Sequence, residues 1–175
     1  MSKNHFDYII CGGGASGLLL AYRMCNDPYF NDQSILLIEK DAKNTNDRTW
    51  CFWELGDGDL EMMVHKTWNQ AYFNADGFEM DFSLAPFQYK MIRSLDFYQF
   101  MQKTLAEFSQ LTQIQERVSS IGENDVTTEV QTYHGGLIFS SIYDPKSLYQ
   151  QKKYPVLLQH FVGQIIETQT EVIVL

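Results

Sequence analysis

The stretch Gly12–Gly17, which reads Gly-Gly-Gly-Ala-Ser-Gly, lies between an apolar run at Phe6–Cys11 and an amphipathic run at Leu18–Cys25. The apolar run predicts a buried parallel strand, and the amphipathic run predicts a helix. The glycines then form a tight turn from strand to helix. Their spacing fits G-x-G-x-x-G, which in this context is the fingerprint of a dinucleotide-binding βαβ unit.

Individual positions of this turn have physical roles. Gly12 lets the chain turn sharply at the end of the strand, and Gly14 has no side chain, so a pyrophosphate can approach its backbone. Gly17 lets the helix pack closely on the strand. At Ala15 and Ser16 the helix begins, and its free N–H groups and positive dipole end are expected to face the phosphates.

A second strand is predicted at Ser34–Ile38, and it leads directly into Glu39. This acid follows Gly17 by about 20 residues, the spacing at which a βαβ unit offers a carboxylate to the ribose hydroxyls. The second strand and its acid therefore strengthen the fingerprint. The alternative is a glycine-rich turn in some other α/β domain.

Composition narrows the class of protein. The chain has 175 residues, of which 45% are hydrophobic and 20% charged, so a globular fold is expected. Its net charge of −9 argues against nucleic-acid binding and against a polybasic membrane anchor. The three cysteines, Cys11, Cys25 and Cys51, form no C-x-x-C pair, which suits a reducing cytoplasm and no zinc site. No signal peptide and no run of about 20 apolar residues is evident.

The rest of the chain predicts an α/β fold: a Rossmann-like parallel sheet with an inserted, mainly antiparallel β region around 55–92. The expected domain spans 1–150, and an incomplete second region spans 151–175. A second helix is expected from Arg93 to about Ser109. The further strands are predicted at 67–73, 78–82, 88–92, 112–118, 125–132 and 136–143, with a hairpin turn at Ala75-Asp76-Gly77.

A polar stretch ends at Arg48, and the aromatic run Trp50–Trp53 follows. Arg48 either reaches a cofactor phosphate with its fixed fork of donors or pairs with a local carboxylate such as Asp47 or Glu54. The aromatic run either walls an apolar site or forms a core strand. The nearby Gly56–Asp59 resembles a calcium loop only superficially, and no metal site is expected.

Several of these segments together resemble bacterial lycopene β-cyclases, flavoproteins whose fold is similar to that of glutathione reductase and aromatic hydroxylases. The resemblance covers about residues 6–168. The glycine turn is generic to flavin and nicotinamide proteins, whereas the tryptophan-rich and histidine-containing segments are more specific. The segments that carry the resemblance are Gly12–Gly17, Glu39, Arg48–Glu54, Arg93-Ser94-Leu95 and Leu158–Gly163.

The resemblance implies FAD binding, with the ADP half of the cofactor on Gly12, Gly14, Gly17 and Glu39. In the wider flavoprotein group an arginine that opens the helix after the inserted sheet reaches the phosphate region, and Arg93 matches that position. The strand after that helix usually lends backbone groups to the adenine, which points to Val118. The alternatives are a surface arginine and a plain core valine.

The implied reaction is the cyclisation of linear lycopene ends to β-rings, started by a proton and without net oxidation. It implies reduced FAD as an essential participant and NAD(P)H as its reductant. Aromatic faces stabilise carbocations, so Trp50, Phe52 and Trp53 either line the cavity or pack in the core. His160 is a candidate proton shuttle or a structural histidine, and Glu54 and Asp144 are further acidic candidates. The catalytic residues remain unassigned.

The chain also departs from the family pattern, because nothing after Gly163 matches the acidic motif expected to supply the catalytic glutamate. We therefore expect an N-terminal fragment that binds FAD weakly and does not cyclise lycopene. The whole enzyme is expected in the cytoplasm, peripheral to the inner membrane in which lycopene dissolves. Two alternatives are an FAD-dependent oxidoreductase or monooxygenase of the same fold and a nucleotide-binding fragment without catalysis.

Overall fold

The computed structural model describes residues 4–143 and the single residues 149, 153 and 157. Internal contacts divide the chain into two compact units, Met1–Ile142 and Tyr143–Leu175. The second region predicted at 151–175 therefore falls almost wholly outside the described residues, as do Asp144 and His160. All the labelled helices and strands belong to the first unit.

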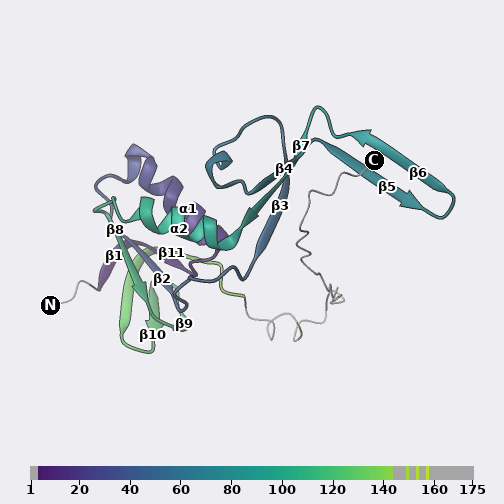
Figure 1. The fold of residues 1–175 in the computed structure, drawn as a ribbon. Coiled ribbons are helices and arrows are strands. Elements are labelled where there is room, and N and C mark those ends of the chain that lie inside the picture. Colours follow the sequence, from purple (N-terminus) through teal and green to yellow (C-terminus); the bar gives the residue numbers. More distant parts are fainter. Residues whose placement is uncertain (1–3, 144–148, 150–152, 154–156, 158–175) are drawn as a thin grey trace. The chain divides into compact units, whose positions relative to one another are not determined.

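A six-stranded sheet forms the centre of this unit, in the order β8-β2-β1-β11-β10-β9 (Figure 1). The first four strands in this order are parallel to one another, whereas β10 pairs antiparallel with both β11 and β9. This arrangement confirms the predicted parallel sheet. The strands are β1 (His5–Cys11), β2 (Ile35–Glu39), β8 (Leu111–Gln115), β9 (Val118–Ile121), β10 (Asp125–Thr128) and β11 (Thr132–Ser140).

Alternate side chains of the parallel strands pack on opposite faces of the sheet, as the two-residue period of a strand requires. On one face Ile35 and Leu37 of β2 pack in a cluster with residues of α1 (Ala15–Asn26) and α2 (Ser94–Leu105). On the other face Leu36 and Ile38 pack in a cluster with Val126 of β10. Both faces are therefore covered, which explains why β2 is apolar at four successive positions.

The inserted β region consists of two smaller antiparallel sheets. Strands β3 (Thr49–Glu54), β7 (Gln88–Arg93) and β4 (Lys66–Trp68) form one in the order β3-β7-β4, and β5 (Gln70–Ala75) and β6 (Phe78–Ser83) form a hairpin. The insertion was predicted around 55–92, but it begins at Thr49 because the whole aromatic strand pairs with β7. The described residues also include two short 3-10 helices, at Pro28–Phe30 and Glu61–Met63.

Three predicted element ends were wrong for local reasons. Helix α2 stops at Leu105, because Glu107 and Phe108 donate to carbonyls three residues back and tighten the chain into a turn. The strand predicted at 125–132 stops at Thr128, whose Oγ1 accepts from the N–H groups of Val130 and Gln131. The strand predicted at 112–118 is β8 followed by the start of β9, so Val118 belongs to β9.

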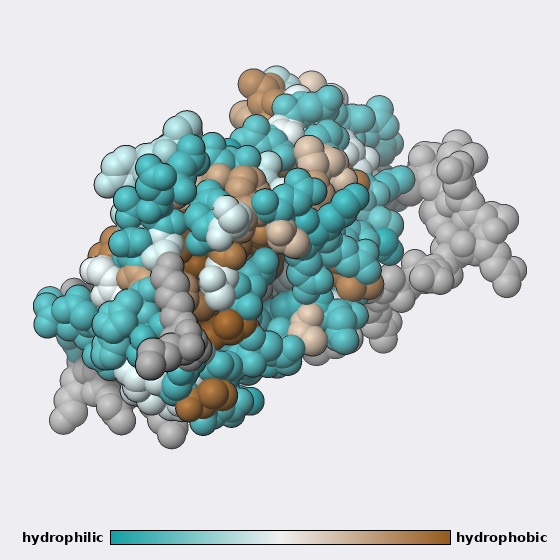
Figure 2. Space-filling view, turned by 90° about the vertical axis from the view of Figure 1, so that its left-hand side faces the viewer, coloured by the Kyte–Doolittle hydropathy of each residue, from teal (hydrophilic) through white to brown (hydrophobic). Residues whose placement is uncertain are grey.

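The surface view in Figure 2 shows a face that is mainly hydrophilic, with hydrophobic side chains gathered near its centre. This distribution suits a chain with a net charge of −9. None of the helices in the described residues combines the length and the apolar character that crossing a bilayer requires.

The three cysteines are expected to differ sharply in reactivity. Burial raises the pKa of the Cys11 and Cys25 thiols to about 11, whereas Cys51 is exposed. Because the thiolate is the reactive form, a thiol reagent at pH 8 should modify Cys51 rapidly in the native protein and the other two only after denaturation. Time-resolved titration with a chromogenic disulfide reagent measures this. Rapid modification of two or more thiols before denaturation would contradict the packing of β1 and α1.

Candidate functional site

The glycine turn joins β1 to α1. Its conformation requires glycine at two positions, Gly12 and Gly17. Gly12 has a φ of +103°, and its N–H donates to the Ile38 carbonyl at 2.8 Å. A Cβ at Gly17 would lie 1.9 Å from the carbonyl oxygen of Gly12. The positive φ at Gly12 and the close approach at Gly17 explain why the fingerprint needs glycine there.

Gly14 differs from its neighbours because its α-carbon faces open space. A Cβ built there would meet no atom within 4 Å. Gly14 is also the N-cap of α1, and no side chain caps the helix. The N–H groups of the first turn therefore lack an intrahelical partner and face a region that an anion can enter. The turn thus offers open backbone and the positive end of a helix at one place.

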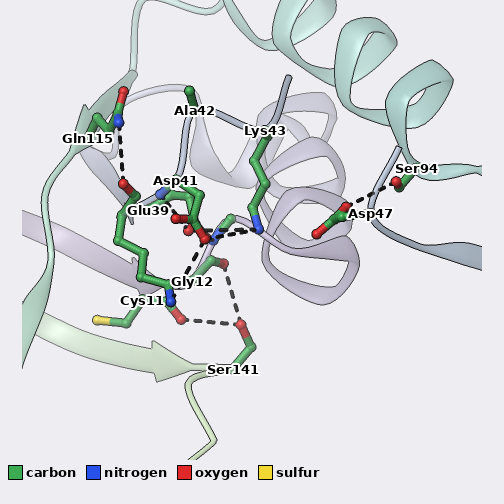
Figure 3. Close-up of polar contacts among 12 residues, drawn as sticks. Cys11, Gly12, Glu39, Asp41, Ala42, Lys43, Asp47, Ser94, Gln115 and Ser141 are labelled. Atoms are coloured by element: carbon green, nitrogen blue, oxygen red, sulfur yellow. Dashed lines mark hydrogen bonds and ion pairs between the residues drawn. The ribbon is translucent and has the colours of Figure 1, made fainter. Parts of the chain in front are cut away.

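Glu39, at the end of β2, is fixed against this turn (Figure 3). Its Oε2 accepts from the Gly13 N–H at 2.6 Å, and its Oε1 accepts from the Asp41 N–H at 2.9 Å. The Lys43 Nζ lies 3.8 Å from Oε1, and both side chains are 16% exposed. An ionised carboxylate has about four acceptor sites, so Glu39 retains capacity for hydroxyl donors. The fingerprint does not predict the hydrogen bond between the Gly13 N–H and Glu39.

A cavity of about 200 Å³ opens beside Glu39, beyond the carboxyl ends of β2 and β8. Ligands of open parallel sheets bind at this edge. Pockets that hold a whole drug-sized ligand measure about 300–1,000 Å³, so this cavity suits part of a dinucleotide. Its lining is Gly13, Leu18, Leu37, Glu39, Asp41, Ala42, Lys43, Gln102, Gln113, Ile114 and Gln115.

Lys43 and Gln115 are two of five polar lining residues that our sequence reasoning missed, and the others are Asp41, Gln102 and Gln113. The Gln115 side chain donates to the Lys40 carbonyl at 3.3 Å, so it bridges the ends of β8 and β2 (Figure 3). Its place at the carboxyl end of a parallel strand was the signal that could have identified it. No comparable signal marked Lys43, which lies in a polar loop.

A second hydrogen-bonded group fixes the loop between β2 and β3 onto the start of α2. The buried Ser94 Oγ donates to Asp47 Oδ1 at 3.1 Å and accepts from the Arg48 N–H at 2.9 Å. Burial alone would raise the pKa of Asp47, but the Ser94 hydrogen bond and the charge of Lys43 lower it below its usual value. Burial and the neighbouring Asp47 raise the pKa of Tyr98 to about 12. Asp47 is therefore the ionised partner.

Neither predicted arginine lines the cavity. The Arg48 guanidinium is exposed and donates to the backbone carbonyl of Asp47 at 3.3 Å, not to a carboxylate. Arg93 forms a two-pronged pair with Asp96, with N–O distances of 2.8 and 3.2 Å. Arg93 keeps N–H donors beyond those two bonds, so its contact with phosphate stays a prediction, as does that of Arg48.

Val118 also lies away from the cavity. It is half-buried on β9, at the opposite edge of the sheet order from β8, and it packs against the cluster on the face away from the helices. This is the core packing given as its alternative. Its predicted backbone contact with adenine therefore stays a prediction.

The aromatic run divides between two faces of β3. Trp50 packs edge-on against Phe97 and Tyr98, with ring centroids 5.3 and 6.0 Å away, and Phe52 contacts the same core cluster. Trp53 points to the other face and is 58% exposed. The structure thus places Trp50 and Phe52 in the core, and Trp53 alone of the three on an open surface.

A family model of lycopene cyclase proteins matches residues 7–173, nearly the whole chain. The chain belongs to the lycopene cyclase family. No curated protein matches it significantly.

Solved structures similar to this family member share its fold. PqsL, a probable FAD-dependent monooxygenase from Pseudomonas aeruginosa, has a TM-score of 0.60 at 13% identity, over 77% of this chain and 42% of its own. 2-Methyl-3-hydroxypyridine-5-carboxylic acid oxygenase has a TM-score of 0.58 at 11% identity, over 79% of this chain and 39% of its own. The chain therefore has the FAD/NAD(P)-binding α/β fold and spans about two-fifths of the length of the structures it matches.

Proposed function

We propose that this chain carries the ADP-binding part of an FAD-dependent lycopene cyclase. The observation that supports FAD most directly is a glycine turn in which Gly14 faces open space while the neighbouring Gly13 N–H donates to Glu39. The open backbone fits a pyrophosphate, and the carboxylate fits ribose hydroxyls. The family membership supports the cyclase reaction.

In this proposal Gly12, Gly14 and the first turn of α1 hold the pyrophosphate, with Ala15, Ser16 and Gly17 donating from the backbone. Glu39 holds the ribose, and the adjoining cavity takes the adenine end of the cofactor. Reduced FAD, regenerated by NAD(P)H, would supply electrostatic or acid–base assistance at the reacting polyene end. The chain's own contribution is to bind and orient the ADP half.

The proposed reaction converts the linear ends of lycopene to β-rings. A proton adds to a terminal double bond, a neighbouring double bond closes the ring, and a ring proton leaves, so the product is an isomer of the substrate. Glu54, one of the acidic candidates, forms an ion pair with Lys90. No catalytic acid is assigned among the described residues, and we propose that residues 1–175 alone bind FAD weakly and do not cyclise lycopene.

Cofactor recognition is testable with the purified chain by calorimetric titration with FAD. We expect saturable FAD binding that excess ADP competes away and FMN does not, because the site holds the ADP part of FAD, of which FMN has only one phosphate. Equal competition by ADP and FMN, or no flavin binding at all, would contradict the proposed site.

The reaction class is testable separately by mass analysis of carotenoids after incubation with lycopene, FAD and NAD(P)H. A cyclase product keeps the mass of lycopene, whereas a product of an oxidoreductase or monooxygenase does not. For residues 1–175 we expect unchanged lycopene. Ring formation by this chain alone would show that the catalytic acid lies within it.

A further inference from the structure

Lys43 lies in the loop between β2 and β3 and has an unusual backbone conformation. Its φ is +50°, and it is the single non-glycine residue with a positive φ among those the structure describes. Residues with a Cβ adopt this left-handed conformation at an energetic cost, whereas glycine does not. Backbone strain of this kind is concentrated at functional sites. The presence of a lysine at such a position points to a role for its side chain.

The Lys43 side chain points into the cavity beside Glu39 (Figure 3). Its Nζ lies 3.8 Å from Glu39 Oε1, 4.0 Å from Asp41 Oδ2 and 5.4 Å from the centroid of the Tyr98 ring. Only 16% of the Lys43 side chain is exposed, and charges attract more strongly where water is partly excluded. Two carboxylates and an aromatic face therefore hold the ammonium next to Glu39.

The loop that carries Lys43 is attached to the elements on both sides of the cavity. The Gln102 side chain of α2 donates to the Ala42 carbonyl at 3.3 Å, and the Asp41 N–H donates to Glu39 Oε1 at 2.9 Å. Strained backbone persists only where the surrounding structure imposes it. These two hydrogen bonds fix the residues immediately before Lys43 and so help to impose its conformation.

The charges around the cavity show what the ammonium contributes. Among the described residues that line the cavity, Lys43 is the one cation, and Glu39 and Asp41 are the two acids. A pyrophosphate at the adjoining glycine turn brings further negative charge. Repulsion from this charge would turn the Glu39 carboxylate away from the ligand, and a cation beside Oε1 offsets that repulsion.

We propose that Lys43 is a positioning residue of the nucleotide site, whose ammonium keeps the Glu39 carboxylate directed at the ribose hydroxyls of the ligand. This assignment rests on the proposed function, in which Glu39 holds the ribose of the ADP half. Because Lys43 acts through Glu39, its effect depends on the ribose hydroxyls that Glu39 contacts. Lys43 is therefore a determinant of the preference of the site for ribonucleotides over 2′-deoxynucleotides.

Calorimetric titration of the full chain with ADP and with 2′-deoxy-ADP tests the assignment. For the wild type we expect ADP to bind about tenfold or more tightly than 2′-deoxy-ADP, because the deoxynucleotide lacks a hydrogen bond to a charged group. Lys43→Met should reduce this ratio to about threefold or less, mainly by weakening the binding of ADP. Lys43→Arg keeps the cation and should retain the wild-type ratio within about twofold.

Lys40→Met is the matched control, because it removes the same charge from the same loop. The Lys40 Nζ lies 3.8 Å from Asp41 Oδ2, but its side chain is 51% exposed and lies outside the cavity lining. This substitution should leave the ratio of the two affinities unchanged. Lys43→Gly removes both the ammonium and the backbone strain, so it should lower the ratio as Lys43→Met does while melting at the same or a higher temperature.

The results separate a role at the ribose from a role at the phosphates. If Lys43→Met weakens ADP and 2′-deoxy-ADP by the same factor, the ammonium acts on the phosphates and the assignment is overturned. An equal fall of the ratio in Lys40→Met would also overturn it. A wild-type chain that binds no ADP would overturn the proposed function as well. A lowered ratio in Lys43→Met and Lys43→Gly, regained in Lys43→Arg and accompanied by wild-type circular dichroism, supports the assignment.

Discussion

Gly17→Ala is expected to destabilise the protein by about 3 kcal/mol, as forced overpacking of a tight contact does, and to remove measurable FAD binding. The added Cβ would lie 1.9 Å from the Gly12 carbonyl oxygen and 3.3 Å from Ile10 Cγ2. The first of these atoms belongs to the backbone, so the clash is relieved only when α1 moves away from β1. Urea denaturation measures the stability, and calorimetric titration with FAD measures the affinity.

Gly14→Ala is the matched control within the same turn. No atom lies within 4 Å of the added Cβ, and the backbone at Gly14 has a φ of −78°. Stability should therefore fall by only about 1 kcal/mol, because alanine is a poorer N-cap than glycine but meets no clash here. FAD affinity should still fall about tenfold or more, because the methyl group occupies the approach of the pyrophosphate. Wild-type affinity in this variant would show that phosphate does not approach the turn there.

The contrast between these two glycines shows what a sequence motif can predict. The fingerprint predicted the close packing at Gly17 and the open backbone at Gly14, because a strand, a turn and a helix are local structures whose periodicity can be read from neighbouring residues. It could not show that Gly13 also contacts Glu39, since that hydrogen bond joins residues 26 positions apart. The local geometry of the turn could be predicted from the sequence, but the hydrogen-bond partner of the Gly13 N–H could not.

In the strands, too, local turns were predicted correctly and long-range pairing was not. The turn predicted at Ala75-Asp76-Gly77 was confirmed, because Gly77 takes a φ of +77° between two strands that pair from Ala75 and Phe78 outward. Val118 was assigned to the wrong strand, because the chain crosses after Gln115 to the opposite edge of the sheet order. An apolar run predicts a strand well. Where one strand ends and the next begins, however, depends on which neighbouring strands they pair with, and the sequence does not show this.

Lys90→Met is expected to lower the melting temperature by roughly 5–10 °C, because it breaks a buried charge cluster. Lys90 lies on β7 with its side chain fully buried, and its Nζ donates to Glu54 Oε2, Glu61 Oε2 and the Gly56 carbonyl. Burial alone would lower the pKa of Lys90, but its hydrogen bonds to Glu61 and Glu54 raise it above its usual value. Lys90 is therefore charged, and without it two carboxylates face each other without a cation.

A lysine in the middle of a predicted strand gave no sign of this arrangement, since both acids lie on other elements. Lys66→Met, on the exposed side of neighbouring β4, is the matched control and should change the melting temperature little. Adding Glu54→Gln and Glu61→Gln to Lys90→Met should recover part of the loss, because the repulsion between the acids disappears. Thermal unfolding followed by circular dichroism measures all three proteins. If the added glutamines lower the melting temperature further, the lysine stabilises this part of the fold by packing and not by charge.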